Sequence, residues 1–135
     1  MADPIPVKGG GGPSPSHAYT DAPDLLQEAT ELTRLAERLR IEATVASLGG
    51  QPYELDELQE RLYLLRWAAL SDRLALAYPD AEQFVIDATQ TAHRLATFDR
   101  AHGTHRGLIG PGANGWAHSH RSYVRQEYGH WIAST

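Results

Sequence analysis

The sequence predicts an all-α fold: an antiparallel bundle of three long helices, with a disordered N-terminal arm and an irregular C-terminal arm that contains a short helix. Three observations support this prediction. Apolar residues recur at helical spacing in three long segments between residues 21 and 102. Glycine or proline stands between these segments, where the chain has to turn. The two remaining segments, 1–20 and 103–135, are rich in glycine.

The composition is that of one globular domain. The chain has 135 residues, 41% of them hydrophobic, and a formal net charge of −5. It has no cysteine, which excludes disulfides, a thiolate nucleophile and thiolate metal sites. The N-terminus lacks the apolar stretch of a secretion signal, and no segment approaches the ~18 apolar residues of a membrane span. We therefore expect a cytoplasmic protein that does not enter a membrane.

Residues 1–20 are expected to form the disordered arm. They contain four consecutive glycines and four prolines, and they have few large apolar side chains. Such a segment cannot bury enough apolar surface to offset the entropy lost on ordering. A phosphate-binding loop would need a strand before the glycines and a lysine-bearing helix after them, and the sequence has neither.

The first long helix is predicted between residues 21 and 49, with Asp21 as its N-terminal cap and Gly49 at its end. Its apolar stripe is a heptad seam that consists of Leu25, Ala29, Leu32, Ala36, Leu39, Ala43 and Ala46. Alanine at every second layer allows a partner helix to approach toward the lower end of the usual ~8–10 Å separation. We therefore expect the seam to pack against one of the other two long helices, and an Ala36→Leu substitution to overpack it.

The second long helix, predicted at residues 53–78, carries two apolar stripes. The first stripe consists of Leu55, Leu58, Leu62, Leu65 and Ala69. The second stripe consists of Tyr63, Trp67, Leu70, Leu74 and Ala77. A helix that is apolar over most of its circumference must be covered on more than one side. We therefore expect this helix to be central in the bundle or to face a second subunit as well.

The third long helix is predicted at residues 80–102, with a capping box formed by Asp80 and Gln83 at its start and Gly103 after its end. Residues 103–115 contain five glycines and a proline, which indicates irregular backbone. A last short helix is predicted from Ala117 to Tyr128. The domain organisation is therefore an arm at 1–20, a bundle at 21–102 and a second arm at 103–135, which packs on the bundle or on a partner.

Charge is distributed unevenly along the chain. Residues 1–99 carry eight basic and sixteen acidic residues, a balance of −8. Residues 100–135 carry four arginines against one glutamate, a balance of +3, together with five of the seven histidines. The protein is thus an acidic bundle with a basic C-terminal arm whose histidines titrate near neutral pH.

Histidines provide the only cluster with the composition of a metal site. The candidate ligands are His102, His105, His118 and His120. Imidazoles without thiolates suit zinc, copper, nickel or iron(II). Surface histidines that only titrate are the simpler interpretation, because the spacing does not match a known helical ligand pair. Apart from a divalent transition metal at these residues, the sequence predicts no cofactor.

The C-terminal arm also has residue types that bind nucleic acid. Arginines contact phosphates and aromatic side chains stack on bases, and the arm interleaves Arg106, Arg121 and Arg125 with four aromatic residues. The acidic bundle would repel a polyanion, however. Tyr, Trp and Arg are also the residue types that dominate protein interfaces. No nucleophile elbow or catalytic triad is present, so the sequence gives no indication of an enzyme.

The leading hypothesis is therefore a non-enzymatic helical interaction or scaffold protein, or a small accessory regulatory protein. The alternatives are a histidine-ligated metal-binding bundle and a nucleic-acid-binding regulator that uses the basic aromatic arm. The candidate interaction residues are Tyr63, Trp67, Leu70, Leu74, Trp116, Arg121, Tyr123, Arg125, Tyr128 and Trp131. We expect the C-terminal arm to cover part of the second stripe, leaving an apolar patch for a partner or for self-association. Acidification should then strengthen the attraction between the arm and the acidic bundle.

Overall fold

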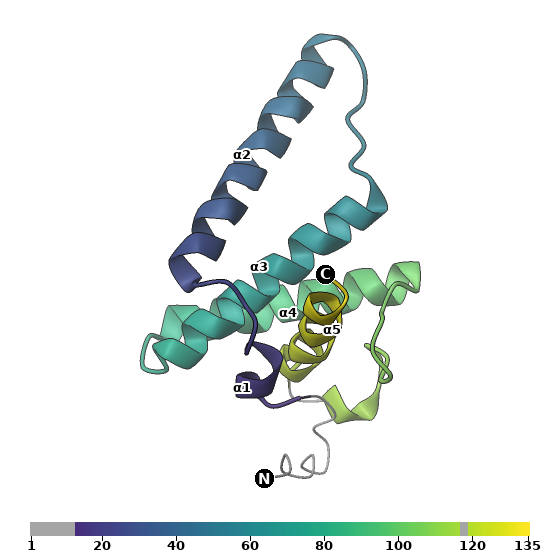
Figure 1. Cartoon of the computed structure of the whole chain (residues 1–135). Coiled ribbons are helices and arrows are strands. Elements are labelled where there is room, and N and C mark those ends of the chain that lie inside the picture. Colours follow the sequence, from purple (N-terminus) through teal and green to yellow (C-terminus); the bar gives the residue numbers. More distant parts are fainter. Residues whose placement is uncertain (1–12, 117–118) are drawn as a thin grey trace.

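A computed structural model describes residues 13–116 and 119–135. All regular structure in these residues is helical, and three long helices follow one another antiparallel, which confirms the predicted fold class (Figure 1). The elements are α1 (Pro15–Ala18), α2 (Leu25–Leu48), α3 (Glu57–Ala77), α4 (Glu82–His102), a 3-10 helix (Asn114–Trp116) and α5 (Arg121–Ala133). None of the described helices is long and apolar enough to cross a membrane.

The centre of the molecule is the hairpin of α3 and α4, with α5 lying across both helices (Figure 1). The core between these three elements combines small residues of the hairpin with large aromatic residues of the C-terminal segment. It consists of Leu65, Ala68, Ala69, Ala92, Leu95, Ala96, Trp116, Tyr123, Val124 and Tyr128. Alanine on the facing sides of α3 and α4 allows these helices to pack closely and leaves room for the aromatic rings.

Helix α2 packs on α3 only near its own N-terminus. Glu28 and Leu32 are its only fully buried residues, and Arg66 of α3 donates to the Glu28 carboxylate at 2.8 Å. The C-terminal half of α2 diverges from α3 (Figure 1). The predicted seam faces inward, but Ala36 and the seam residues beyond it are only half-buried. Ala36 is therefore not enclosed in the core, which argues against the overpacking expected from leucine at this position.

The segment between α2 and α3 explains this divergence. Residues 51–56 are not helical, so α3 begins at Glu57 and not at residue 53 as predicted. The Tyr53 hydroxyl donates to Glu42 at 3.0 Å, which fastens this connection to α2. An extended connection holds the end of α2 away from α3, whereas the tight turn that we expected would have brought the two helices together.

The long helices end within one residue of the predicted positions, but they start later. Asp24, not Asp21, caps α2, because its carboxylate accepts a hydrogen bond from the Gln27 amide at 3.4 Å. The predicted capping box of α4 is absent: Ala81 is the N-cap residue, and no side chain bonds there. Gly103 closes α4 with a φ of 63°, the left-handed conformation that favours glycine.

The predicted N-terminal arm is only partly within the described structure. Residues 1–12 lie outside it. Residues 13–20, where we expected disorder, include α1, in which Ala18 is buried against α5. The Tyr19 hydroxyl donates to the Asp72 carboxylate at 2.6 Å. A specific buried partner therefore orders this part of the segment, which composition alone could not indicate.

Candidate functional site

Three buried carboxylates fasten the C-terminal segment to the α3–α4 hairpin. They are Asp72 on α3, Asp99 on α4 and Glu127 on α5, and each is at most 1% exposed. We call them the carboxylate clamps. A carboxylate offers about four lone-pair sites. What each clamp could do chemically therefore depends on how many of these sites remain open.

Asp72 joins three helices. It accepts hydrogen bonds from the Tyr19 hydroxyl at 2.6 Å and from Arg121 Nε at 2.6 Å. Arg125 adds a two-pronged contact through Nε at 2.8 Å and Nη2 at 3.0 Å. With these four donors, Asp72 links α1 and α5 to α3 and has no lone pair left for a ligand.

Asp99 is equally occupied. Arg61 of α3 donates to its two oxygens at 2.7 and 3.0 Å, Thr104 donates at 2.7 Å, and the Tyr123 hydroxyl completes the set. Burial raises the pKa of Asp99, but the hydrogen bonds from Arg61, Tyr123 and Thr104 outweigh it and hold the pKa below its ordinary value. Burial, together with the hydrogen bond to Asp99, raises the pKa of Tyr123. At neutral pH, Asp99 is therefore a charged anchor with a neutral tyrosine beside it.

Glu127 holds the irregular segment that leads from α4 to α5. Its oxygens accept hydrogen bonds from the backbone amides of Arg106 and Gly107, at 2.5 and 2.7 Å. Arg61 donates to it at 2.7 Å and Gln126 at 2.9 Å. Because Arg61 also binds Asp99, one buried guanidinium connects two of the three clamps. All three carboxylates are saturated, so we assign them to stability and not to catalysis or metal binding.

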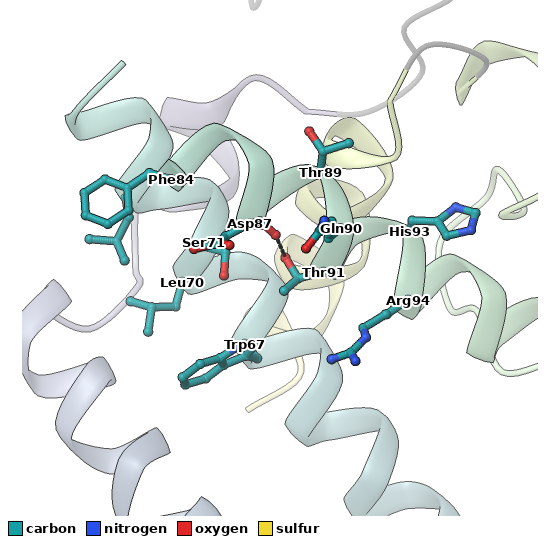
Figure 2. Close-up of a pocket in the computed structure, with 11 residues that line it drawn as sticks. Trp67, Leu70, Ser71, Phe84, Asp87, Thr89, Gln90, Thr91, His93 and Arg94 are labelled. Atoms are coloured by element: carbon teal, nitrogen blue, oxygen red, sulfur yellow. Dashed lines mark hydrogen bonds between the residues drawn. The ribbon is translucent and has the colours of Figure 1, made fainter. Parts of the chain in front are cut away.

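The opposite side of the hairpin is open. A groove of about 840 Å³ lies between α3 and α4, with Trp67, Leu70 and Leu74 on one wall and Phe84 and Thr91 on the other (Figure 2). The α3 residues of the groove point away from the α3 residues that contact α5, because positions 67, 70 and 74 lie half a turn from positions 65 and 69 on a helix. The groove is therefore not covered by α5.

The floor of the groove is apolar and its edges are polar. Trp67 is 36% exposed and stacks on Tyr63 with ring centroids 6.2 Å apart. On the α4 side, Asp87 accepts a hydrogen bond from Gln83 at 2.8 Å. Arg94 lies at the end of the groove away from Phe84 (Figure 2). An apolar surface with opposite charges along one wall can take up an amphipathic helix and orient it.

The structure brings four of the predicted interaction residues together at this groove. Trp67, Leu70 and Leu74 line it, and Tyr63 supports Trp67. We expected the C-terminal arm to cover this stripe, and that expectation is wrong. The arm packs instead on the first stripe, against Leu65, because the clamps on α3 and α4 lie on that side.

The other six predicted interaction residues are engaged within the chain. Arg121 and Arg125 are paired with Asp72. The aromatic residues are buried or half-buried, and Arg66 lies over the Trp131 ring at 5.7 Å. These six residues are Trp116, Arg121, Tyr123, Arg125, Tyr128 and Trp131. In this fold, none of these six residues offers an unpaired arginine or a fully exposed ring for stacking on the bases of a nucleic acid.

The candidate metal ligands are dispersed in the described residues. His102 contacts Glu57 through Nδ1 at 2.6 Å, whereas His120 lies beside His93 with ring centroids 5.7 Å apart. His105 lies near Gly110, and His118 is outside the described residues. No group of three His, Cys, Asp or Glu side chains in the described part of the chain is placed to hold a metal ion.

The pKa of His120 is lowered in the folded protein. Burial lowers its pKa, and the nearby charges of His93 and Arg100 lower it further, although a hydrogen bond with the Pro111 backbone opposes them. Protonation of His120 is therefore disfavoured in the folded protein. At this residue, the direction of the pKa shift opposes the expected strengthening of the arm by acidification, which stays a prediction.

Sequence reasoning missed the carboxylate clamps, although a signal for them was present. Asp72 continues the first apolar stripe of α3 at heptad spacing, three residues after Ala69. Asp99 continues the apolar stripe of α4, four residues after Leu95. A carboxylate on an apolar stripe has to be paired when the stripe is buried. Such positions therefore predict a buried partner of opposite charge, here an arginine.

Comparisons with protein-family models, with curated proteins and with solved structures found no significant match to this chain.

Proposed function

We propose that the protein is a non-enzymatic interaction protein, a scaffold or small accessory subunit, whose α3–α4 groove binds an amphipathic helix of another chain. The observation that carries this proposal is the open groove of about 840 Å³ lined by Trp67, Leu70, Leu74 and Phe84. Trp67 is 36% exposed and Leu74 and Phe84 are half-buried, and apolar surface left in water costs about 25 cal/mol per Å². Binding of a helix would remove this cost.

The composition of the groove supports the proposal. Tryptophan and tyrosine are the residue types that most often dominate binding energy at protein interfaces, and Trp67 and Tyr63 stack beside each other here. Helix grooves of this kind recognise apolar anchors spaced along one face of a partner helix. Asp87 and Arg94 would select the direction of that helix through its charges.

The competing functions have less support. The saturated clamps Asp72, Asp99 and Glu127 have no open lone pair for acid–base chemistry. Of the arginines that suggested nucleic-acid binding, Arg121 and Arg125 are paired with Asp72, and only Arg106 is exposed. The aromatic residues of the arm are buried or half-buried. A histidine-ligated metal has no three-residue ligand group among the described residues.

The proposal is tested by photo-crosslinking in the native host. A photoreactive phenylalanine analogue replaces Gln90, which is exposed at the groove, and in a control protein it replaces Leu108, which is exposed in the loop before α5. We expect a discrete protein adduct from position 90 only. Substitution Trp67→Glu in the same protein should abolish the adduct while the helical content in circular dichroism is retained. Equal labelling from both positions, or no labelling from position 90, would rule out the groove as the binding site for a partner helix.

A further inference from the structure

We infer that the helix bound in the α3–α4 groove is α2 of a second copy of this chain. This inference rests on the proposed function of the groove. Its basis is an exposed apolar ridge on α2, formed by Ile41, Val45 and Leu48, which are 50%, 63% and 84% exposed. These residues are spaced i, i+4 and i+7, which is the anchor spacing of helices that bind in grooves.

None of the described residues covers the ridge. It lies on the face of α2 opposite the heptad seam, because positions 41, 45 and 48 are about half a turn from positions 39, 43 and 46. The seam faces α3, so the ridge faces away from it. The C-terminal half of α2 also projects from the rest of the molecule (Figure 1). One chain therefore presents both an unfilled groove and an unburied ridge.

The ridge and the groove match in length. From Glu37 to Leu48, α2 extends ~16 Å, and from Phe84 to Arg94, α4 extends ~15 Å, at ~1.5 Å per residue. With α2 of the second copy antiparallel to α4, Leu48 lies beside Phe84. The same alignment places Ile41 beside Thr91.

Complementary charges favour the antiparallel direction of α2 relative to α4 of the other copy. In the antiparallel alignment, Glu37 of one copy lies beside Arg94 of the other. Arg94 is exposed and has no ion-pair partner within the described residues, and Glu37 is held only by an exposed contact with Arg40. The parallel alignment would instead place Leu48 beside Arg94 and Glu37 beside Phe84. Complementary charge at one end and apolar contact at the other therefore favour the antiparallel alignment.

Each copy offers one ridge and one groove. When two copies pair around a two-fold axis, the ridge of each copy lies in the groove of the other, so both ridges and both grooves are filled. A one-way contact would instead leave one of each open and propagate into a chain of copies. We therefore assign the assembly as a closed dimer with two identical contacts.

Disulfide trapping tests the alignment, because the natural chain has no cysteine. The full-length variant Leu48→Cys/Phe84→Cys should oxidise to a covalent dimer. Two matched controls should stay largely uncrosslinked: Leu48→Cys/Leu108→Cys, with an exposed site outside the groove, and Glu37→Cys/Phe84→Cys, with the wrong end of the ridge. Crosslinking in the controls at the same rate would overturn the alignment. A ladder of higher species would overturn the closed dimer.

Sedimentation tests the contact without a crosslink. The natural chain should sediment as a dimer, and both Ile41→Glu on the ridge and Leu74→Glu in the groove should give monomers. A mixture of the two variants should form heterodimers, because the ridge of one and the groove of the other remain intact. Ile41 is half-exposed on its own helix, so its variant keeps the monomer fold as judged by circular dichroism. A natural chain that is monomeric at every concentration, or a mixture without heterodimers, would overturn the inference.

The Ile41→Glu variant distinguishes a failure of this inference from a failure of the proposed function. In the photo-crosslinking experiment from position 90, self-association gives a homodimer adduct that Ile41→Glu abolishes. An adduct with a different protein, unchanged by Ile41→Glu, would retain the groove as a docking site and refute the second copy as its occupant. No adduct of either kind would refute both.

Discussion

The two sides of the α3–α4 hairpin differ in what covers them. The side that faces α5 contains small apolar residues and the buried carboxylates Asp72 and Asp99, and it is closed. The other side contains the larger apolar side chains Trp67, Leu70 and Leu74, and it is open as a groove. Within the described residues, the second apolar stripe of α3 is thus covered only in part: Leu70 is buried, whereas Trp67 is 36% exposed.

Directional interactions account for this difference. Apolar burial alone would be satisfied by packing α5 on either side, because it is non-directional. The hydrogen bonds that Asp72 and Asp99 require can be made only where Arg121, Arg125 and Tyr123 of α5 reach them. An unpaired buried carboxylate costs more than an exposed apolar side chain, so the positions of the charges decide which side α5 covers.

Removing a clamp should produce the largest loss of stability. Asp99→Ala leaves the buried Arg61 without its two-pronged partner and leaves the Tyr123 hydroxyl without an acceptor. Breaking a buried ion pair in this way costs about 3–5 kcal/mol. Urea unfolding measured by circular dichroism gives this value directly.

The matched control is Arg38→Gln, which breaks an exposed ion pair with Glu42 on α2. Exposed pairs contribute little to stability, so this variant should unfold at the same urea concentration as the natural chain. An Asp99→Ala protein that is as stable as the Arg38→Gln control would show that the clamps do not hold the closed side.

Leu65 and Trp67 are close in sequence on α3 but lie on opposite sides of the hairpin. Substituting each of them therefore compares the two sides within a single helix. Leu65→Ala on the closed side removes a fully buried side chain and should cost about 2–5 kcal/mol. Trp67→Ala on the open side removes a larger side chain but should cost only about 1 kcal/mol of monomer stability, because Trp67 is exposed to solvent in the groove. Thermal or urea melts at low protein concentration measure both. An equal loss from the two substitutions would mean that the groove is closed in solution.

Helix α2 offers a similar comparison along its own seam. Leu32→Ala should cost about 2–5 kcal/mol, because Leu32 is fully buried against α3. Ala36→Leu, one turn further on, should change stability by less than about 0.5 kcal/mol, because Ala36 is only half-buried. A loss of about 1–3 kcal/mol for Ala36→Leu would instead indicate a closely packed seam, with α2 lying flat on the hairpin in solution.

The fold was largely predictable because it depends on local patterns. The apolar periods located all three long helices, and residues such as Gly103 set their ends, since glycine is favoured in the left-handed conformation after a helix. The starts were less predictable, because Asp21 and Asp24 are chemically equal candidates for the cap of α2. Which of the two caps the helix depends on where the chain before α2 is anchored.

The candidate site was predictable only in part. The stripe of Trp67, Leu70 and Leu74 was identified from its spacing, but its exposure was not, because exposure depends on which stripe α5 covers. That choice depends on contacts between residues far apart in sequence, such as Arg61 with Glu127 and Tyr19 with Asp72. Periodicity describes one helix at a time and carries no information on these contacts.

The smallest expected effect concerns pH. Because the pKa of His120 is lowered in the folded protein, the unfolded chain takes up a proton at this residue at a higher pH than the folded chain does. The stability that neutral His120 contributes is therefore fully present above the unfolded pKa of about 6.5 and is lost as the pH falls through the lower folded pKa. The melting temperature of the natural chain should decrease slightly between pH 7.5 and pH 5, and His120→Gln should reduce that decrease. A melting temperature that rises on acidification, and does so less in His120→Gln, would show that protonation of this residue tightens the closed side after all.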